Sequence, residues 1–255
     1  MILPVRPFPG TIGVARKEPG RYSSVPPGEF AGNLDIRDLV EGTSLYVPVH
    51  VPGALLWTGD SHAGQGNGEI NLTAIETAYR EFNITVEVIK GKPLDFPRIE
   101  TAKSWVTMGF DQDLNKAWAQ AKAQTVKFLA QQRGVAPDAA EKMMAGVSDC
   151  RVSQVVNIKK GIHCLNPKNA RGKEDMERPT KETPKYLVSH AKDADLNKAM
   201  DAASMGMIKL LEKDKKIARL DAYSLASMAM DCRVGAVSDT EKNVHCLMPK
   251  SIWAK

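Results

Sequence analysis

An internal repeat constrains the fold of this chain more than any other feature of its sequence. Three short motifs occur twice, without a gap and at a single offset of 82 residues: DLNKA at 113 and 195, DCRV at 149 and 231, and HC at 163 and 245. One offset shared by three separate motifs is typical of a duplicated supersecondary unit. The sequence therefore predicts two copies of one unit after about residue 103.

Each copy is predicted to contain a strand, two helices and two further strands. A short strand precedes Asp113 or Asp195, which is placed to cap a helix whose apolar residues recur on one face. A second, shorter helix follows, opened in the first copy by Pro137, since proline fits the first turn of a helix. Two strands then close each copy, around RVSQVV and IHCL in the first and RVGAV and VHCLM in the second. The repeat therefore predicts α+β units.

The first hundred residues have a different pattern, one of short strands and turns. Two runs rich in β-branched residues, 45–51 and 84–89, are expected to be strands, and the second alternates apolar and polar residues as a half-buried strand does. Prolines and glycines interrupt the sequence every few residues, which favours an antiparallel sandwich or barrel. We therefore expect four segments: a β-rich domain at 1–102, the first unit at 103–168, a charged linker at 169–184 and the second unit at 185–255.

The composition argues against several classes of protein. Of the 255 residues 43% are hydrophobic and 25% are charged, as in ordinary globular proteins, and no apolar run approaches the roughly 20 residues that span a bilayer. The net charge of +5 is spread over segments that also carry acidic residues, so we expect no nucleic-acid partner. The N-terminal MILPVRPFPG lacks a secretory pattern, which predicts a cytoplasmic protein without membrane contact.

The stretch 57–69, WTGDSHAGQGNGE, combines acidic residues and a histidine with four glycines. Asn67-Gly68 is a turn signal, so residues 60–69 are expected to form a loop between two strands, the second beginning at Ile70. Asp60 and His62 would point to the same side of an extended segment, where a carboxylate and an imidazole suit a divalent cation such as zinc. The same two residues would equally serve to cap a turn and to bond a backbone carbonyl, and their spacing alone does not choose between the two interpretations.

The same stretch is part of a wider resemblance. Several segments occur in the order found in the acetamidase/formamidase family of amide hydrolases: PFPGTIGVA at 7–15, GNLDIRDL at 32–39, LYVPVHVPGALLWTGDSHAGQGNGEI at 45–70, and the DCRV and HCLNPK endings. The resemblance covers most of the first 168 residues. The chain departs from the family in beginning close to the first of these segments, without the usual N-terminal segment, in having Asn67 where members have aspartate, and in its second α+β copy.

The resemblance implies a fold and a site. Combined with the repeat, it implies an α+β chain in which a jelly-roll-like antiparallel β-sandwich is followed by two repeated α+β units. It implies a divalent metal ion, zinc in the first place, bound by Asp60 and His62, with Glu69 as the general base. The remaining polar residues of these motifs are expected to line the substrate pocket: Asn33, Asp35 and Gln65.

The implied reaction is the hydrolysis of a small carboxamide, such as formamide or acetamide, to a carboxylate and ammonia. A metal-bound water would attack the carbonyl, and Glu69 would accept a proton from the water and return it to the leaving nitrogen. A homo-oligomer is implied as well. The departures from the family keep an alternative open, a catalytically inactive relative that acts as a structural or assembly component. A ligand absent from this chain would have to come from another subunit.

The four cysteines form two equivalent pairs, one in each copy: Cys150 with Cys164, and Cys232 with Cys246. Because the cytoplasm keeps thiols reduced, we expect small buried side chains here, with disulfides within each unit as the second interpretation. A thiol nucleophile at Cys150 is a further alternative, although the equivalent Cys232 favours a structural part. His163 and His245 also recur at equivalent positions and are expected to serve the structure.

Overall fold

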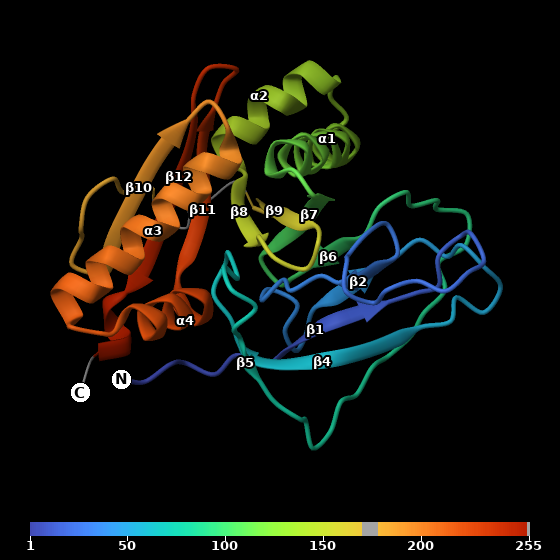
Figure 1. The fold of residues 1–255 in the computed structure, drawn as a ribbon. Coiled ribbons are helices and arrows are strands. Elements are labelled where there is room, and N and C mark those ends of the chain that lie inside the picture. The colour runs from blue at the N-terminus through green and yellow to red at the C-terminus, as the bar shows by residue number, and fades with distance from the viewer. Residues whose placement is uncertain (170–177, 254–255) are drawn as a thin grey trace.

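A computed structural model describes residues 1–169 and 178–253 (Figure 1). The first part of the chain contains the strands β1 (Phe8–Gly13), β2 (Ala31–Asn33), β3 (Ser44–Tyr46), β4 (Trp57–Gly64), β5 (Ile75–Glu76) and β6 (Arg98–Glu100). It is followed by β7 (Ser104–Asp111), α1 (Leu114–Arg133), α2 (Pro137–Val147), β8 (Asp149–Gln154) and β9 (Lys160–Pro167). The last elements are β10 (Tyr186–Asp193), α3 (Leu196–Lys215), α4 (Arg219–Ala229), β11 (Asp231–Val237), β12 (Lys242–Pro249) and the 3-10 helix η2 (Lys250–Trp253). Of the expected linker, residues 170–177 lie outside the described residues.

The strands form two sheets. The smaller has the order β2-β1-β4-β5, and the larger has the order β10-β12-β11-β8-β9-β7-β6-β3. The pairings between these strands are antiparallel. The α+β class is thus confirmed, while the jelly-roll description of the first part stays a prediction. Because β3 and β6 belong to the larger sheet, that sheet crosses the domain boundary expected at residue 102.

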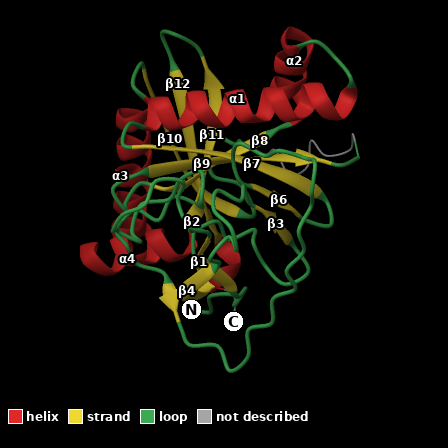
Figure 2. Ribbon diagram, turned by 90° about the vertical axis from the view of Figure 1, so that its right-hand side faces the viewer, coloured by secondary structure: helices red, strands yellow, loops and turns green. Residues whose placement is uncertain are grey.

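The segments 104–167 and 186–249 have the same order of elements, a strand, two helices and two strands. In the first, α1 packs on β7 and β9, and in the second α3 packs on β10 and β12, so the helices cover one face of the larger sheet (Figures 1 and 2). Asp113 and Asp195 cap α1 and α3 as expected, and Pro137 opens α2. The helices and strands expected here are confirmed, and descent of the two segments from one duplicated unit stays a prediction.

The DLNKA motifs meet at the N-termini of α1 and α3. Asn115 donates a hydrogen bond from Nδ2 to Oδ1 of Asp195 (2.8 Å), and Asn197 donates in the same way to Oδ1 of Asp113 (2.7 Å). The Oδ1 atom of each asparagine accepts the first backbone amide of the other helix. Since the first amides of a helix lack partners within it, each motif completes the cap of the opposite helix. The repeated motif therefore links the two segments directly.

Two hydrophobic cores lie on opposite faces of the larger sheet. The larger core joins the four helices to the sheet and contains most of the apolar stripes expected on α1 and α3. The smaller core lies between the sheet and the first part of the chain, where Val106 and Met108 of β7 pack with Leu34. The alternate residue Thr107 points to the other face and bonds to Thr125 of α1 (2.6 Å). Within the described residues, no helix has both the length and the apolar composition to cross a membrane.

Four expectations for the first part differ from the structure, and the strand expected at 45–51 is confirmed only at its beginning. The run 45–51 forms only the short β3, and 84–89 forms no strand and is exposed along its whole length. Its alternation predicted a half-buried strand, but no layer of the described structure covers it. The loop expected at 60–69 is a strand as far as Gly64, because β4 pairs with β1. Ile70 begins no strand and is instead buried in the larger core.

The expectation of reduced cysteines is also wrong. Cys150 forms a disulfide with Cys164, and Cys232 forms one with Cys246. In both pairs the antiparallel register places the two cysteines directly opposite each other, with their Cα atoms 4.0 Å apart. Neighbouring strands therefore bring the thiols within bonding distance. None of the four cysteines is free, which removes the alternative of a thiol nucleophile at Cys150.

Candidate functional site

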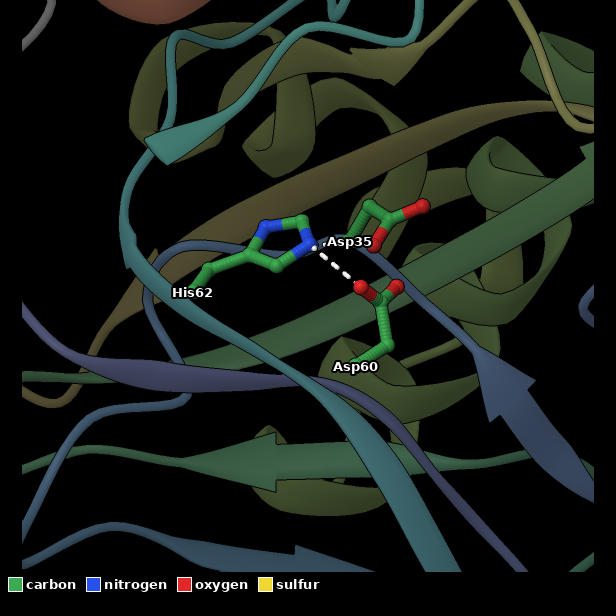
Figure 3. A group of neighbouring side chains, drawn as sticks. All are labelled: Asp35, Asp60 and His62. Carbon is green, nitrogen blue, oxygen red and sulfur yellow. Dashed lines mark hydrogen bonds and ion pairs between the residues drawn. The ribbon is translucent and has the colours of Figure 1, made fainter. Parts of the chain in front are cut away.

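Asp35, which follows β2, converges with Asp60 and His62 of β4 across the intervening strand β1 (Figure 3). One ligand atom from each lies within 4.8 Å of the others. The His62 Nε2 atom lies 3.1 Å from Oδ1 of Asp60 and 4.0 Å from Oδ1 of Asp35. Asp35 and His62 are buried, whereas the side chain of Asp60 is 35% exposed, so the cluster faces solvent on the Asp60 side. The structure thus places the predicted pair together and adds Asp35, which the sequence had assigned to the pocket lining.

Gln65 determines which nitrogen of His62 faces the two aspartates. The Nε2 amide of Gln65 donates to the backbone carbonyl of Asp35 (3.1 Å), so its Oε1 atom is the acceptor that lies 2.7 Å from Nδ1 of His62. Nδ1 therefore carries a hydrogen, and the neutral ring presents the lone pair of Nε2 to carboxylate oxygens. That arrangement needs a positive charge between them, supplied either by a proton on Nε2 or by a cation. Burial lowers the pKa of His62, but the hydrogen bond with Asp60 and the charge of Asp35 outweigh it and raise the pKa.

Two further observations show that the cluster fits a cation. Oδ1 of Asp35 is buried and has no hydrogen-bond partner, although the carboxylate is 1% exposed. Gly10 of β1 lies against the cluster, and a Cβ atom there would come within 2.9 Å of both this oxygen and Nε2 of His62. Only glycine leaves that space open. An unpaired carboxylate oxygen, a second carboxylate and an imidazole around it form a donor set that suits zinc or a similar divalent ion.

The backbone of the site is strained. Asp35, Asp60 and Glu69 all have positive φ, at 48°, 52° and 35° respectively. Non-glycine residues rarely adopt this region, and such residues gather at functional sites, where the surrounding structure holds them in place. All three carboxylates that were singled out in the sequence therefore share a conformation that their residue type does not favour.

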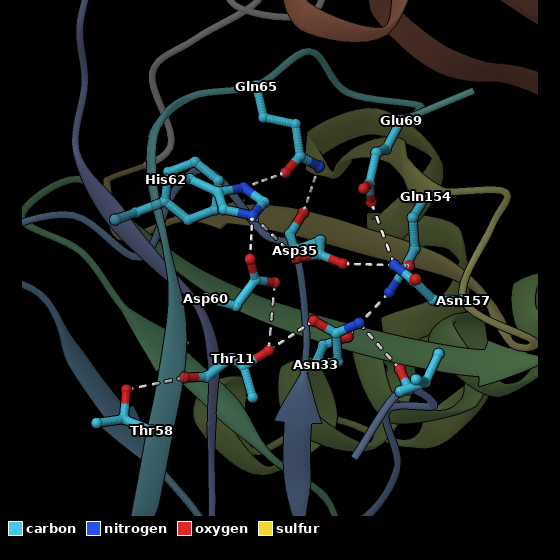
Figure 4. A network of polar contacts seen from close by, with 12 residues as sticks. Thr11, Asn33, Asp35, Thr58, Asp60, His62, Gln65, Glu69, Gln154 and Asn157 are labelled. Atoms are coloured by element: carbon cyan, nitrogen blue, oxygen red, sulfur yellow. Dashed lines mark hydrogen bonds and ion pairs between the residues drawn. The ribbon is translucent and has the colours of Figure 1, made fainter. Parts of the chain in front are cut away.

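Glu69 lies on the far side of Asp35 from His62, next to the β8–β9 hairpin (Figure 4). Its Oε2 atom is 3.5 Å from Nδ2 of Asn157, and its carboxyl group interacts with that of Asp35. Burial raises the pKa of Glu69 to about 7, and the charges of Asp60 and Glu76 add to the shift. Burial also raises the pKa of Asp35, with the charge of Glu69 as the next cause. The predicted base thus lies beside the cluster without belonging to it.

The turn that carries Glu69 is clamped between the two α+β segments. Gly66 donates to the carbonyl of Ser227 in α4, and Cys232 of β11 donates to the carbonyl of Asn67. Gly68 exchanges backbone hydrogen bonds with β8, at Ser153 and at the following Val155. A Cβ on Gly66 would lie 2.4 Å from the carbonyl oxygen of Met230, so this close approach requires glycine. The glycines of the motif therefore let the turn fit between β8 and β11.

Asn67 has a structural part in this clamp. Its Nδ2 atom donates to Oδ1 of Asp231 (2.6 Å), which also pairs with Arg37 (3.3 Å). Arg37 in turn lies 3.5 Å from the carbonyl of Gln65. An amide at position 67 suits this environment, because it donates to a buried carboxylate that a second carboxylate would repel.

Asn33 is close to the cluster but is engaged with other protein groups. Its Oδ1 atom accepts a hydrogen bond from Thr11 (2.6 Å), and its Nδ2 atom donates to the carbonyl of Val25 (2.9 Å). Thr11 also lies 3.5 Å from Oδ2 of Asp60. The amide of Asn33 thus bonds to Thr11, which lies beside Asp60, and does not face the cluster. Its expected part in lining a substrate pocket stays a prediction.

Sequence reasoning missed two side chains of the site, Gln154 and Asn157. Both come from the first copy of the repeat, but neither is identical in the second copy, so the repeated motifs do not include them. The second copy has Ala236 and Asp239 at the corresponding positions. A difference between otherwise matching motifs was the available signal, because a side chain that serves only one location is free to differ in the other copy.

Comparisons with known proteins identify the family of the chain. Residues 13–255 match the model of the acetamidase/formamidase family. The chain is similar to an acetamidase of Mycolicibacterium smegmatis, with 41% identity over 68 residues, which are 27% of this chain and 17% of that protein. It is similar to a formamidase of Methylophilus methylotrophus, with 46% identity over 56 residues, 22% of this chain and 14% of that protein.

A solved structure gives the same result. The acetamidase of Bacillus halodurans is 33% identical, with a TM-score of 0.58 over 65% of this chain and 55% of that one. The matched part of this chain thus spans about half of that structure and a smaller share of the two curated relatives. Since the family model matches nearly the whole chain, this protein belongs to the acetamidase/formamidase family.

Proposed function

We propose that this protein hydrolyses a small carboxamide, of the size of formamide or acetamide, to a carboxylate and ammonia. Membership of the family supports amide hydrolysis, and the relatives carry the names acetamidase and formamidase. The observation that carries the proposal is the convergence of Asp35, Asp60 and His62 around the space that Gly10 leaves open. We further propose that these three side chains hold a divalent metal ion, zinc in the first place.

Each group of the site has a proposed part in the reaction. When bound, the cation polarises the amide carbonyl and lowers the pKa of water in the site. Glu69, beside the cluster, accepts a proton as the water oxygen bonds to the carbonyl carbon, and returns it to the nitrogen as the C–N bond breaks. One water is consumed, and the immediate products are a neutral carboxylic acid and ammonia. The acid then gives its proton to ammonia, which leaves a carboxylate and an ammonium ion, so atoms and charges balance. Gln65 keeps the His62 ring in the orientation that cation binding needs.

The proposal is tested on the purified full chain. Metal content is measured by emission spectroscopy, and ammonia release is followed with formamide and with acetamide. We expect about one divalent ion per chain and release of ammonia from at least one of the two amides. His62→Ala is expected to lose both the metal and the activity.

Glu69→Gln is the matched second variant, because it preserves the shape of the side chain and removes its basic oxygen. We expect it to keep the metal and to lose activity by about a hundredfold or more, as proton-transfer groups contribute 10²–10⁴-fold. A wild-type protein without metal and without activity would instead support the inactive relative. Retention of metal and full turnover by His62→Ala would refute the assignment of the site.

The remaining expectations stay predictions. A homo-oligomer, a cytoplasmic location and the choice of zinc are all carried by the resemblance or by composition. The two disulfides bear on the location, because disulfides persist mainly in oxidising compartments. Analytical ultracentrifugation of the full chain would decide the first, and separation of cell compartments followed by detection of the protein would decide the second.

A further inference from the structure

The β8–β9 hairpin reaches the candidate site with a side chain that no motif of the family resemblance contains. The turn of this hairpin places Asn157 between the carboxyl groups of Asp35 and Glu69 (Figure 4). Nδ2 of Asn157 lies 2.8 Å from Oδ2 of Asp35 and 3.5 Å from Oε2 of Glu69. One amide group thus contacts both the proposed cation ligand and the proposed base.

Gln154 determines how that amide is oriented. Gln154 is fully buried, and its Nε2 atom donates to the backbone carbonyl of Asn33 (2.9 Å). Its Oε1 atom is therefore left as an acceptor, and Nδ2 of Asn157 donates to it (2.5 Å). Because an acceptor lies on each side, the amide of Asn157 has to present its NH2 group, not its carbonyl oxygen. The two hydrogen bonds of Gln154, to Asn33 and to Asn157, therefore orient the NH2 group of Asn157 toward Asp35.

The orientation of Asn157 has a direct consequence for Asp35. Oδ2 of Asp35 accepts the hydrogen bond from Asn157, so its other oxygen, Oδ1, is the one that remains without a partner and faces His62. A carboxylate held by one oxygen cannot turn freely, and the free oxygen is thereby directed toward the cation space. Such outer contacts to a metal ligand set its geometry and commonly change metal affinity when they are lost.

The backbone of the hairpin turn is unusual as well. Asn157 and Ile158 both have positive φ, at 60° and 67°, and a β-branched isoleucine rarely adopts this region. The β11–β12 turn spans 238–241, against 155–159 in the first hairpin, and contains no residue with positive φ among those described. In the second hairpin, Ala236 and Asp239 are exposed to solvent. Of the two hairpins, the one that meets the site is therefore the one with the strained turn.

From these contacts we infer that Asn157, oriented by Gln154, is a positioning residue that directs one oxygen of Asp35 toward the cation and keeps the Glu69 carboxyl beside it. The inference rests on the proposed function for its chemical meaning. It assigns the second α+β segment no equivalent part, although that segment has the same order of elements.

The test compares Asn157→Ala with Asp239→Ala, the matched change in the other hairpin. Alanine removes the amide at 157 without adding a charge. Full-length proteins are stripped of metal with a chelator and titrated with zinc by calorimetry, and kcat and KM are measured with the better amide. We expect Asn157→Ala to bind zinc about 10–100-fold more weakly and to lose kcat with little change in KM. Asp239→Ala should match the wild type in all three.

A second variant controls for misfolding of the first. Crystal structures then separate the positioning part of Asn157 from the proposed function. Gln154→Ala leaves Asn157 in place without its orienting partner and should weaken zinc binding in the same direction. Crystal structures of both variants should show the Asp35 carboxylate turned away from His62. Unchanged zinc affinity, kcat and Asp35 orientation would overturn the inference. If the wild type itself binds no zinc and hydrolyses no amide, the proposed function fails, and the Asp35 orientation still decides whether Asn157 positions it.

Discussion

The hairpins β8–β9 and β11–β12 begin alike and end differently. Both start with the residues DCRV, both close with a disulfide between opposite cysteines, and both contain a register shift before the turn. The tip of the first hairpin lies against the first part of the chain, where Gln154 is fully buried. The tip of the second, around Asp239, is exposed to solvent. Similar strands thus carry two tips with different surroundings.

The strands of these hairpins are constrained by the contact between the two segments, whereas the tips are constrained by whatever packs against each of them. The buried pairs Asp149 with Arg151 and Asp231 with Arg233 are formed in both segments, at 2.6 and 2.7 Å. These pairs lie where the two segments meet, at the single register pair between β8 and β11. The tips lie away from this junction, so their sequences follow what packs against each. Four predictions test this separation.

The largest effect is expected at the junction, from Asp231→Ala. Asp231 is buried beside Arg37, Arg151 and Arg233, and the substitution leaves those charges without their carboxylate. Breaking a buried pair by removing one partner costs about 3–5 kcal/mol. We expect a loss of that size in the free energy of unfolding, measured in urea by circular dichroism. Asp149→Ala, the matched change in the first segment, should cost less, and an equal loss would contradict this ranking.

The second prediction concerns the disulfides, which should contribute equally. In both, the cysteines are 14 positions apart in the sequence, so the chain-entropy gain on closing the loop is the same, about 3 kcal/mol. Double cysteine-to-alanine variants of each pair should therefore lower the Tm by similar amounts under non-reducing conditions. With reductant present, the Tm of the wild type should fall toward the Tm values of both variants. A loss confined to one pair would show that the two hairpins differ in their strands as well as in their tips.

The third prediction uses the histidines that precede the second cysteine of each hairpin. Nε2 of His163 lies 3.4 Å from Oδ2 of Asp38, whereas Nδ1 of His245 contacts the carbonyl of Pro179 at 3.2 Å. Burial lowers the pKa of His245 to about 4. The unfolded chain, with a pKa of about 6.5 for this group, therefore takes up the proton first as the pH falls.

Stability that His245 supplies at neutral pH is thus lost between about pH 6.5 and pH 4, and the loss reaches about 2 kcal/mol at pH 5. His245→Asn should remove this part of the pH dependence. Urea unfolding of wild type and variant at about pH 7.5 and pH 5 measures the difference, and the other titrating groups cancel in it. Parallel pH profiles for the two proteins would mean that the histidine is not buried in its neutral form.

The smallest effect is expected at the helix caps. Asp113→Ala and Asp195→Ala each remove a cap worth about 1 kcal/mol. Because the asparagines beside them bond across to the opposite aspartate, the two losses should not add in the double variant. Unfolding free energies of the two single variants and the double variant measure this coupling. Simple additivity would show that the crossed hydrogen bonds contribute nothing beyond the separate caps.

Local pattern predicted the second part of the chain well because its helices carry their own signals. The Asp113 and Asp195 caps and the apolar stripes behind them are fixed by neighbours three or four residues away. The run 84–89 has an equally clear alternation, yet it is exposed, since alternation states which face is apolar and not whether another layer covers it. Burial is a tertiary property, and sequence pattern alone did not determine it there.

The candidate site was predictable to the extent that its residues are close in sequence. Asp60, His62 and Gln65 lie within six residues, and the structure brings them together. Asp35 was placed in the pocket but not in the cluster, because it follows β2, and β1 joins β2 to β4 by two pairings between segments distant in sequence. Asn157 comes from still farther along the chain, and only the comparison of the two hairpins would have singled it out.

The clamp around Gly66 and Gly68 makes the position of the proposed base, Glu69, depend on the completion of folding. The turn holding Glu69 takes its backbone partners from α4 and β11 on one side and from β8 on the other. A chain in which only one segment has folded leaves the carboxylate unplaced and the strained turn free to relax. If the proposed function holds, ammonia release would therefore report on chains in which both segments have folded.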